Sequence, residues 1–106
     1  MTLDEYQKAA CEFAVYPPAV GRAYTALGLA GEAGEVAEKV KKWIRDGKTA
    51  AEVTLEVEAE LGDVFWYVAL VAKEWNIPLS DVADLNLEKL ADRKARGVLR
   101  GSGDHR

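Results

Sequence analysis

The sequence predicts an all-α protein, a four-helix bundle that works as an oligomer. Four stretches carry apolar residues at helical spacing, short turn signals separate them, and no stretch shows the period-two β-branched pattern of a strand. The turn signals are Pro17-Pro18, Asp46-Gly47-Lys48 and Asn76-Ile77-Pro78. A chain of 106 residues allows one domain. We expect this helical domain over residues 1–97 and an irregular tail with two glycines over residues 98–106.

The first two helices are expected over residues 3–15 and 22–46. Thr2 and Glu5 have the spacing of a capping box at the start of the first. The apolar face of this helix is Tyr6, Ala9, Ala10 and Phe13. In the second helix, glycine recurs at positions 28, 31 and 34, and each interior glycine costs about 1 kcal/mol against alanine. Such glycines indicate either a close approach between helices or room for a ligand.

The third helix is expected over residues 50–76, with Thr49 as its N-cap. Its central part, residues 61–72, carries a single charge, Asp63. A helix that is apolar on nearly every side must be covered on nearly every side. Three further helices of one chain can hardly provide that cover, so we expect a homodimer or a homotetramer, with Trp66 as a subunit contact.

The fourth helix is expected over residues 79–96 and ends before Gly97. Asn86, Lys89 and Arg93 fall on one of its faces. These side chains could bind phosphate oxygens. Alternatively, they form an ordinary solvated face near a helix C-terminus, where cations are favoured.

Composition excludes several classes of protein. The net charge is −4, which argues against a nucleic-acid partner. No run of about 18 apolar residues is present and the N-terminus is polar, so we expect no membrane span, no signal peptide and a cytoplasmic location. The chain has one cysteine and one histidine, His105. A zinc site or a Ser-His-Asp triad is therefore not expected.

Carboxylates are the remaining side chains that could support catalysis or bind a metal. Glu32 and Glu35 lie on one edge of the second helix, and Glu60 and Asp63 lie on the matching edge of the third. If the two helices pack antiparallel, the four carboxylates converge and repel, with Lys39 as the nearest cation. An all-oxygen set favours Mg²⁺, with Mn²⁺ possible. The alternatives are a solvated acidic face and a di-iron site, which normally needs histidines that this chain lacks.

Three stretches resemble one known family. They are Gly-Leu-Ala-Gly-Glu-Ala-Gly-Glu-Val-Ala-Glu at 28–38, Glu-Leu-Gly-Asp-Val at 60–64 and Asn-Leu-Glu-Lys-Leu-Ala-Asp-Arg at 86–93. In order and spacing they resemble the MazG-like nucleoside triphosphate pyrophosphohydrolases, whose metal motif is Glu-x-x-Glu followed by Glu-x-x-Asp. The residues Leu3-Asp4-Glu5-Tyr6-Gln7 and the Gly-Ser-Gly-Asp tail resemble short members of the same family.

The resemblance implies hydrolysis of a nucleoside triphosphate, NTP or dNTP, to a nucleoside monophosphate and pyrophosphate. Glu32, Glu35, Glu60 and Asp63 would then hold Mg²⁺, and Asn86 and Lys89 would bind the substrate, with Arg93 as a further candidate. We assign Glu35 as the general base, and we leave the role of Glu38 open. Such an enzyme would clean the nucleotide pool. The alternative is a non-catalytic helical oligomer that acts as an interaction module.

Overall fold

The computed structural model describes all 106 residues and contains only helices. They are α1 (Leu3–Cys11), the short 3₁₀ helix η1 (Pro18–Val20), α2 (Gly21–Asp46), α3 (Ala50–Glu74) and α4 (Leu79–Ala95). The all-α prediction is therefore confirmed. The first helix ends at Cys11 rather than at residue 15, and Phe13, expected on its apolar face, is 70% exposed.

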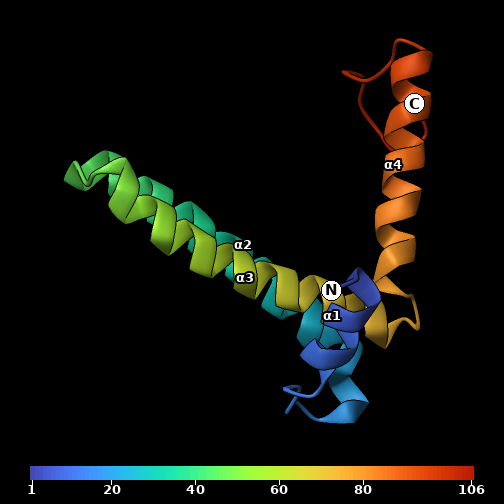
Figure 1. Cartoon of the computed structure of the whole chain (residues 1–106), viewed down its shortest axis with the longest axis horizontal. Helices are drawn as coiled ribbons and strands as arrows, with labels where there is room; N and C mark the ends of the chain where they lie inside the picture. Colours follow the sequence, from blue (N-terminus) through green and yellow to red (C-terminus); the bar gives the residue numbers. More distant parts are fainter.

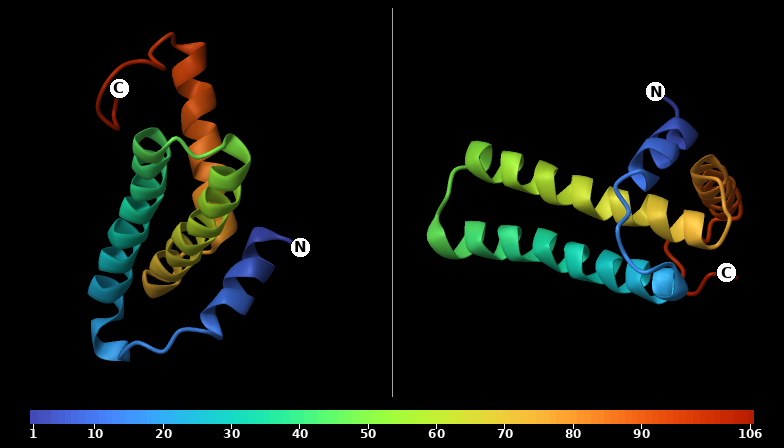
Figure 2. Two further views of the ribbon diagram at one scale, coloured as in Figure 1. Left: turned by 90° about the vertical axis from the view of Figure 1, so that its left-hand side faces the viewer. Right: turned by 90° about the horizontal axis from the view of Figure 1, so that it is seen from below.

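The two longest helices, α2 and α3, form an antiparallel hairpin (Figures 1 and 2). The chain reverses at Gly47, whose φ of +65° ends α2 in the left-handed region. Thr49 then caps α3, because its side chain accepts a hydrogen bond from the amide of Glu52 at 3.3 Å. This hairpin places the middle of α2 beside the middle of α3.

The small core lies where α1, α3 and α4 meet. Its buried members are Ala10, Ala69, Ala72 and Leu79. Trp66 packs against them, and its indole nitrogen donates a hydrogen bond to the carbonyl of Ala10 at 2.9 Å. Trp66, which we expected at a subunit contact, thus anchors α1 to α3 within one chain, and its half-buried ring keeps one side open.

Side chains of α1 also fix the start of α4. The Gln7 amide donates to the carbonyls of Ala69 and Ile77, at 3.2 and 3.0 Å, and its oxygen accepts from the Leu79 amide at 3.0 Å. The Asp4 carboxylate accepts from the amide and the hydroxyl of Ser80, at 2.9 and 2.7 Å. Since these bonds satisfy free amides of the first turn of α4, α1 supplies the cap that Pro78 cannot.

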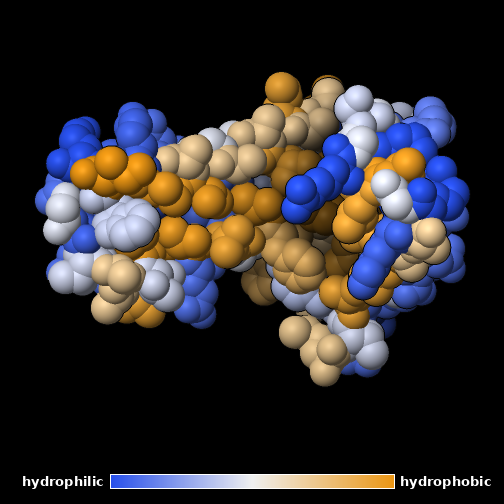
Figure 3. Space-filling view, turned by 90° about the horizontal axis from the view of Figure 1, so that it is seen from above, coloured by the Kyte–Doolittle hydropathy of each residue, from blue (hydrophilic) through white to orange (hydrophobic).

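One chain leaves much of its apolar surface open. From the junction, α4 leads away from the hairpin and has no packing contact with α2 (Figure 1). Only nine residues are buried, and a broad apolar stripe runs along the hairpin (Figure 3). The four helices thus do not close a bundle within one chain. No stretch of any helix combines the length and apolar character that spanning a bilayer requires.

Candidate metal centre

Three carboxylates meet across the α2–α3 hairpin. Glu32 comes from α2, and Glu60 and Asp63 come from successive turns of α3. One oxygen atom of each lies within 4.8 Å of the others. Glu32 and Glu60 are half-buried and Asp63 is exposed, so the cluster opens to solvent on one side. Residues three positions apart share a helix face, which is why Glu60 and Asp63 lie together as their spacing predicts.

The cluster carries more negative charge than its surroundings offset. Burial raises the pKa of Glu32, and the nearby carboxylates of Asp63, Glu60 and Glu35 raise it further. One cation faces the cluster, Lys39, whose ammonium nitrogen lies 3.9 Å from a carboxylate oxygen of Glu60. This confirms that Lys39 is the near cation. A single long ion pair leaves two of the three negative charges uncompensated, and this favours a bound cation.

The other two glutamates of α2 lie outside the three-carboxylate cluster. Glu35 is exposed and one turn further along the helix, although it is near enough to contribute to the raised pKa of Glu32. Glu38 pairs with Lys41 at 2.8 Å, and that hydrogen bond lowers the pKa of Glu38. Glu38 therefore has a partner of its own and does not belong to the acidic cluster.

Tyr67 lies beside the carboxylate cluster, one helical turn after Asp63. Its ring crosses α2 at Gly28, where a Cβ atom would lie 2.7 Å from the ring Cδ1 and still closer to Cε1 and Cζ. Nothing lies within 4 Å of a Cβ atom at Gly31 or Gly34. The close-approach interpretation of the glycines is therefore confirmed for Gly28 alone.

The three candidate phosphate ligands lie on α4, away from the acidic cluster. Asn86 is exposed, whereas Lys89 and Arg93 both bind Asp104 of the C-terminal tail. Arg93 is 5% exposed, because the tail covers its guanidinium group. One chain does not bring these side chains to the carboxylates. The partnership with Asp104 was missed from the sequence, where only the polar tail hinted at a role.

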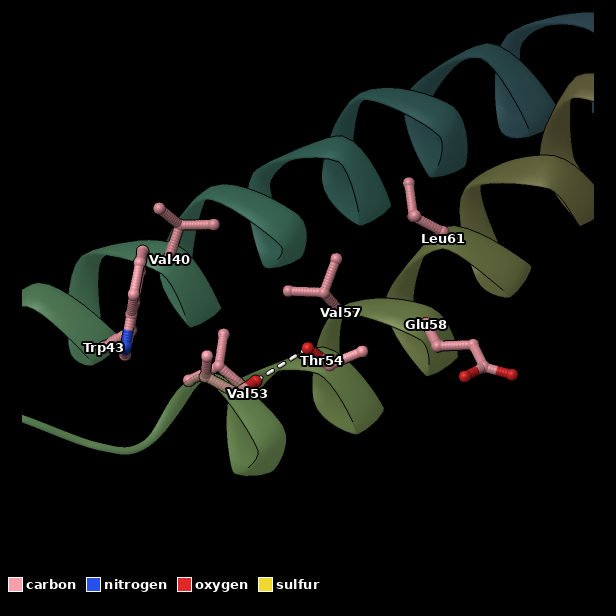
Figure 4. Close-up of a pocket in the computed structure, with 8 residues that line it drawn as sticks. Val40, Trp43, Val53, Thr54, Val57, Glu58 and Leu61 are labelled. Carbon is pink, nitrogen blue, oxygen red and sulfur yellow. Dashed lines mark hydrogen bonds between the residues drawn. The ribbon is translucent and has the colours of Figure 1, made fainter.

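A separate apolar groove lies at the far end of the hairpin (Figure 4). Val40 and Trp43 of α2 face Val53, Val57 and Leu61 of α3 across it, as Figure 4 shows. The groove contains no basic residue, and Glu58 is the one charged side chain in its lining. It is therefore unsuited to a triphosphate and resembles a surface that another protein covers.

Comparisons with known proteins place the chain in one family. A family model described as "MazG nucleotide pyrophosphohydrolase domain" matches residues 22–98, which include both arms of the acidic cluster and the cations of α4. The chain is 49% identical to the "Gene 37 protein" of Mycobacterium phage L5 over 114 aligned positions, which cover the whole of both chains. No solved structure shows a significant similarity to the chain.

Proposed function

The chain belongs to the MazG nucleotide pyrophosphohydrolase family, and from this premise we propose that it hydrolyses nucleoside triphosphates, NTPs or dNTPs, to a nucleoside monophosphate and pyrophosphate. The observation that supports the proposal is the cluster of Glu32, Glu60 and Asp63. Its three negative charges face a single lysine, and the excess charge suits a bound divalent cation. We also propose that the reaction depends on Mg²⁺ and cleans the nucleotide pool.

The residues of the cluster fit a hard divalent cation. All donors are carboxylate oxygens, the cluster carries excess negative charge, and no histidine or cysteine stands beside it. Glu32, Glu60 and Asp63 would hold the ion, and Glu35 could join from the next turn. When bound, Mg²⁺ offsets phosphate charge and lowers the pKa of a water ligand. Mn²⁺ has the same preference for oxygen and can replace it.

Glu35 is our candidate general base. It is exposed and lies outside the three-carboxylate cluster, so one of its oxygens stays available to accept a proton from the attacking water even when the other joins the metal. The water forms the new bond to phosphorus, the anhydride between the α- and β-phosphates breaks, and pyrophosphate leaves. Replacing Glu35 by Gln should lower kcat by about 10²–10⁴-fold, the usual contribution of a general base.

A second copy of the chain completes our proposal. The chain exposes 7556 Å², whereas a compact monomer of 11.6 kDa exposes about 5,800 Å². The excess of about 1,700 Å² is within the range that each subunit of an obligate oligomer buries. We therefore propose a homodimer or homotetramer in which the apolar groove is covered and Asn86 and Lys89 of one chain serve the carboxylates of another.

Two matched leucines test the oligomer. Leu61 lines the groove and is 52% exposed, whereas Leu55 is 71% exposed on the same helix and outside the groove. Leu61→Glu should dissociate the protein in analytical ultracentrifugation, and Leu55→Glu should leave it assembled. Wild-type protein that sediments as a monomer would contradict the proposal.

Product analysis tests the reaction itself. Wild-type protein is incubated with a panel of NTPs and dNTPs, with Mg²⁺, with Mn²⁺ or with EDTA, and the products are identified by chromatography. We expect monophosphate and pyrophosphate only when the metal is present. Mixing the inactive variants Glu60→Gln and Lys89→Gln should restore part of the activity if the cations come from another chain. Folded, assembled protein that turns over no nucleotide would favour the interaction module instead.

A further inference from the structure

The C-terminal tail turns back onto α4 instead of extending from it (Figure 2). The reversal passes through Gly103, whose φ of +82° suits glycine. Arg106 then closes the loop, because its guanidinium donates to the carbonyls of Val98 and Leu99 at 3.1 and 3.2 Å. The tail is thus a defined loop, and this loop presents Asp104 to the side of α4.

Asp104 contacts both cations that the sequence assigned to phosphate. One of its carboxylate oxygens accepts from Lys89 Nζ at 2.7 Å and from Arg93 Nη2 at 3.0 Å. Its backbone carbonyl accepts from the same Arg93 nitrogen at 2.8 Å. These hydrogen bonds lower the pKa of the Asp104 carboxyl, first through Lys89 and then through Arg93. A carboxylate of the chain thus occupies an anion site built from two cations.

On the basis of the proposed function, we propose that the tail is an autoinhibitory strap: Asp104 holds Lys89 and Arg93 until a phosphate group of the substrate displaces it. Carboxylate and phosphoryl oxygens accept the same charge-assisted hydrogen bonds from lysine and arginine, so the two anions compete for one place. A triphosphate carries more charge than one carboxylate. Asp104 is also the exposed partner, at 67%, whereas the side chain of Arg93 is 7% exposed.

The docked tail and a bound phosphate exclude each other at Lys89 and Arg93. Lys89 is half-buried and points its ammonium group at Asp104, and Arg93 is covered by the same loop. Arg93 can therefore reach a phosphate only after the loop has moved. Because apparent affinity scales with the fraction of molecules in the open state, a strap that is docked about nine-tenths of the time weakens anion binding about tenfold.

The test uses the full-length chain and the substitution Asp104→Asn, which keeps the shape and removes the charge. Asp84→Asn is the matched control, since Asp84 is exposed on the same helix and forms no ion pair with the tail, Lys89 or Arg93. Calorimetry measures the binding of inorganic tripolyphosphate without metal, and steady-state kinetics measure KM for the triphosphate. Asp104→Asn should tighten binding and lower KM by about three- to tenfold, and Asp84→Asn should change neither.

Trypsin cleavage after Arg100 reports the position of the strap directly. Tripolyphosphate should speed release of the peptide 101–106 from the wild type, and Lys89→Gln should abolish this effect. Because neither binding nor cleavage needs turnover, both readouts remain valid if no nucleotide is hydrolysed. Equal or weaker binding by Asp104→Asn would overturn the inference and make Asp104 a residue that positions the two cations. Protection of Arg100 by tripolyphosphate would also overturn it, because the tail would then close over the ligand.

Discussion

The contact between Gly28 and Tyr67 gives the sharpest prediction about how the site is built. In Gly28→Ala, the new methyl group would lie 2.7 Å from Cδ1 of Tyr67 and nearer still to two other ring atoms. Carbon atoms rest at about 3.5–4.0 Å, so the ring must move by about 1 Å or the helices must separate. Gly31→Ala and Gly34→Ala are matched controls, since their methyl groups meet nothing within 4 Å.

Two opposed effects set the magnitude. Forcing extra volume into a packed contact costs about 1–3 kcal/mol. Replacing an interior helical glycine by alanine gains about 1 kcal/mol, and this gain applies at all three positions. Gly31→Ala and Gly34→Ala should therefore stabilise the protein, and Gly28→Ala should be about 1–3 kcal/mol less stable than either.

Urea unfolding at one fixed protein concentration measures the difference, because the stability of an oligomer depends on concentration. The same substitutions are then repeated with Tyr67→Leu, whose smaller side chain removes the clash. In that background, the cost of Gly28→Ala should disappear. A Gly28→Ala variant as stable as Gly31→Ala would contradict this packing, and so would a cost that is unchanged when Tyr67 is leucine.

Three further changes test other parts of the structure. Asp4→Asn should lower the melting temperature at pH 7, because the amide keeps one acceptor oxygen for Ser80 but loses the second acceptor and the charge. Since the Ser80 hydrogen bonds lower the pKa of Asp4, the difference in melting temperature from wild type should close as the pH falls below 3.8. If the difference in melting temperature stays constant in acid, the ionised Asp4 carboxylate is not the source of the lost stability. Trp66→Phe loses the bond to Ala10 and should cost about 1–2 kcal/mol in urea unfolding, whereas a neutral result would show that Trp66 does not anchor α1. Glu32→Gln should raise the melting temperature of metal-free protein at pH 7 but not below pH 4.5, since the raised pKa of Glu32 destabilises the fold only once that group ionises. Added Mg²⁺ should stabilise wild type more than Glu32→Gln, and an equal effect would place the ion elsewhere.

Local spacing made much of the hairpin and its site predictable. Helical periodicity and the turn at Gly47 give two antiparallel helices, and a spacing of three residues puts Glu60 and Asp63 on one face. The spacing alone does not reveal that Glu35 stands outside the close cluster. That outcome depends on how far α2 is rotated against α3, which the packing of Tyr67 on Gly28 helps to fix.

The direction of α4 and the place of the tail could not be predicted in this way. Asp4 and Gln7 fix the start of α4 through hydrogen bonds to residues more than 60 positions away, and no periodic pattern encodes them. The contact of Asp104 with Lys89 depends on a loop that reverses at Gly103. Likewise, an apolar residue such as Trp66 fits a subunit contact or an internal one equally well until its neighbours are known.

We propose that the carboxylates of the α2–α3 hairpin hold the metal used for hydrolysis. Glu60→Gln tests it against Glu38→Gln, a matched control in which the lost carboxylate pairs with Lys41 instead of joining the cluster. Mn²⁺ binding by electron paramagnetic resonance and Mg²⁺-dependent pyrophosphate release are measured on both variants. We expect Glu60→Gln to lose metal binding and turnover together, and Glu38→Gln to keep both. Wild-type turnover by Glu60→Gln would contradict the proposal.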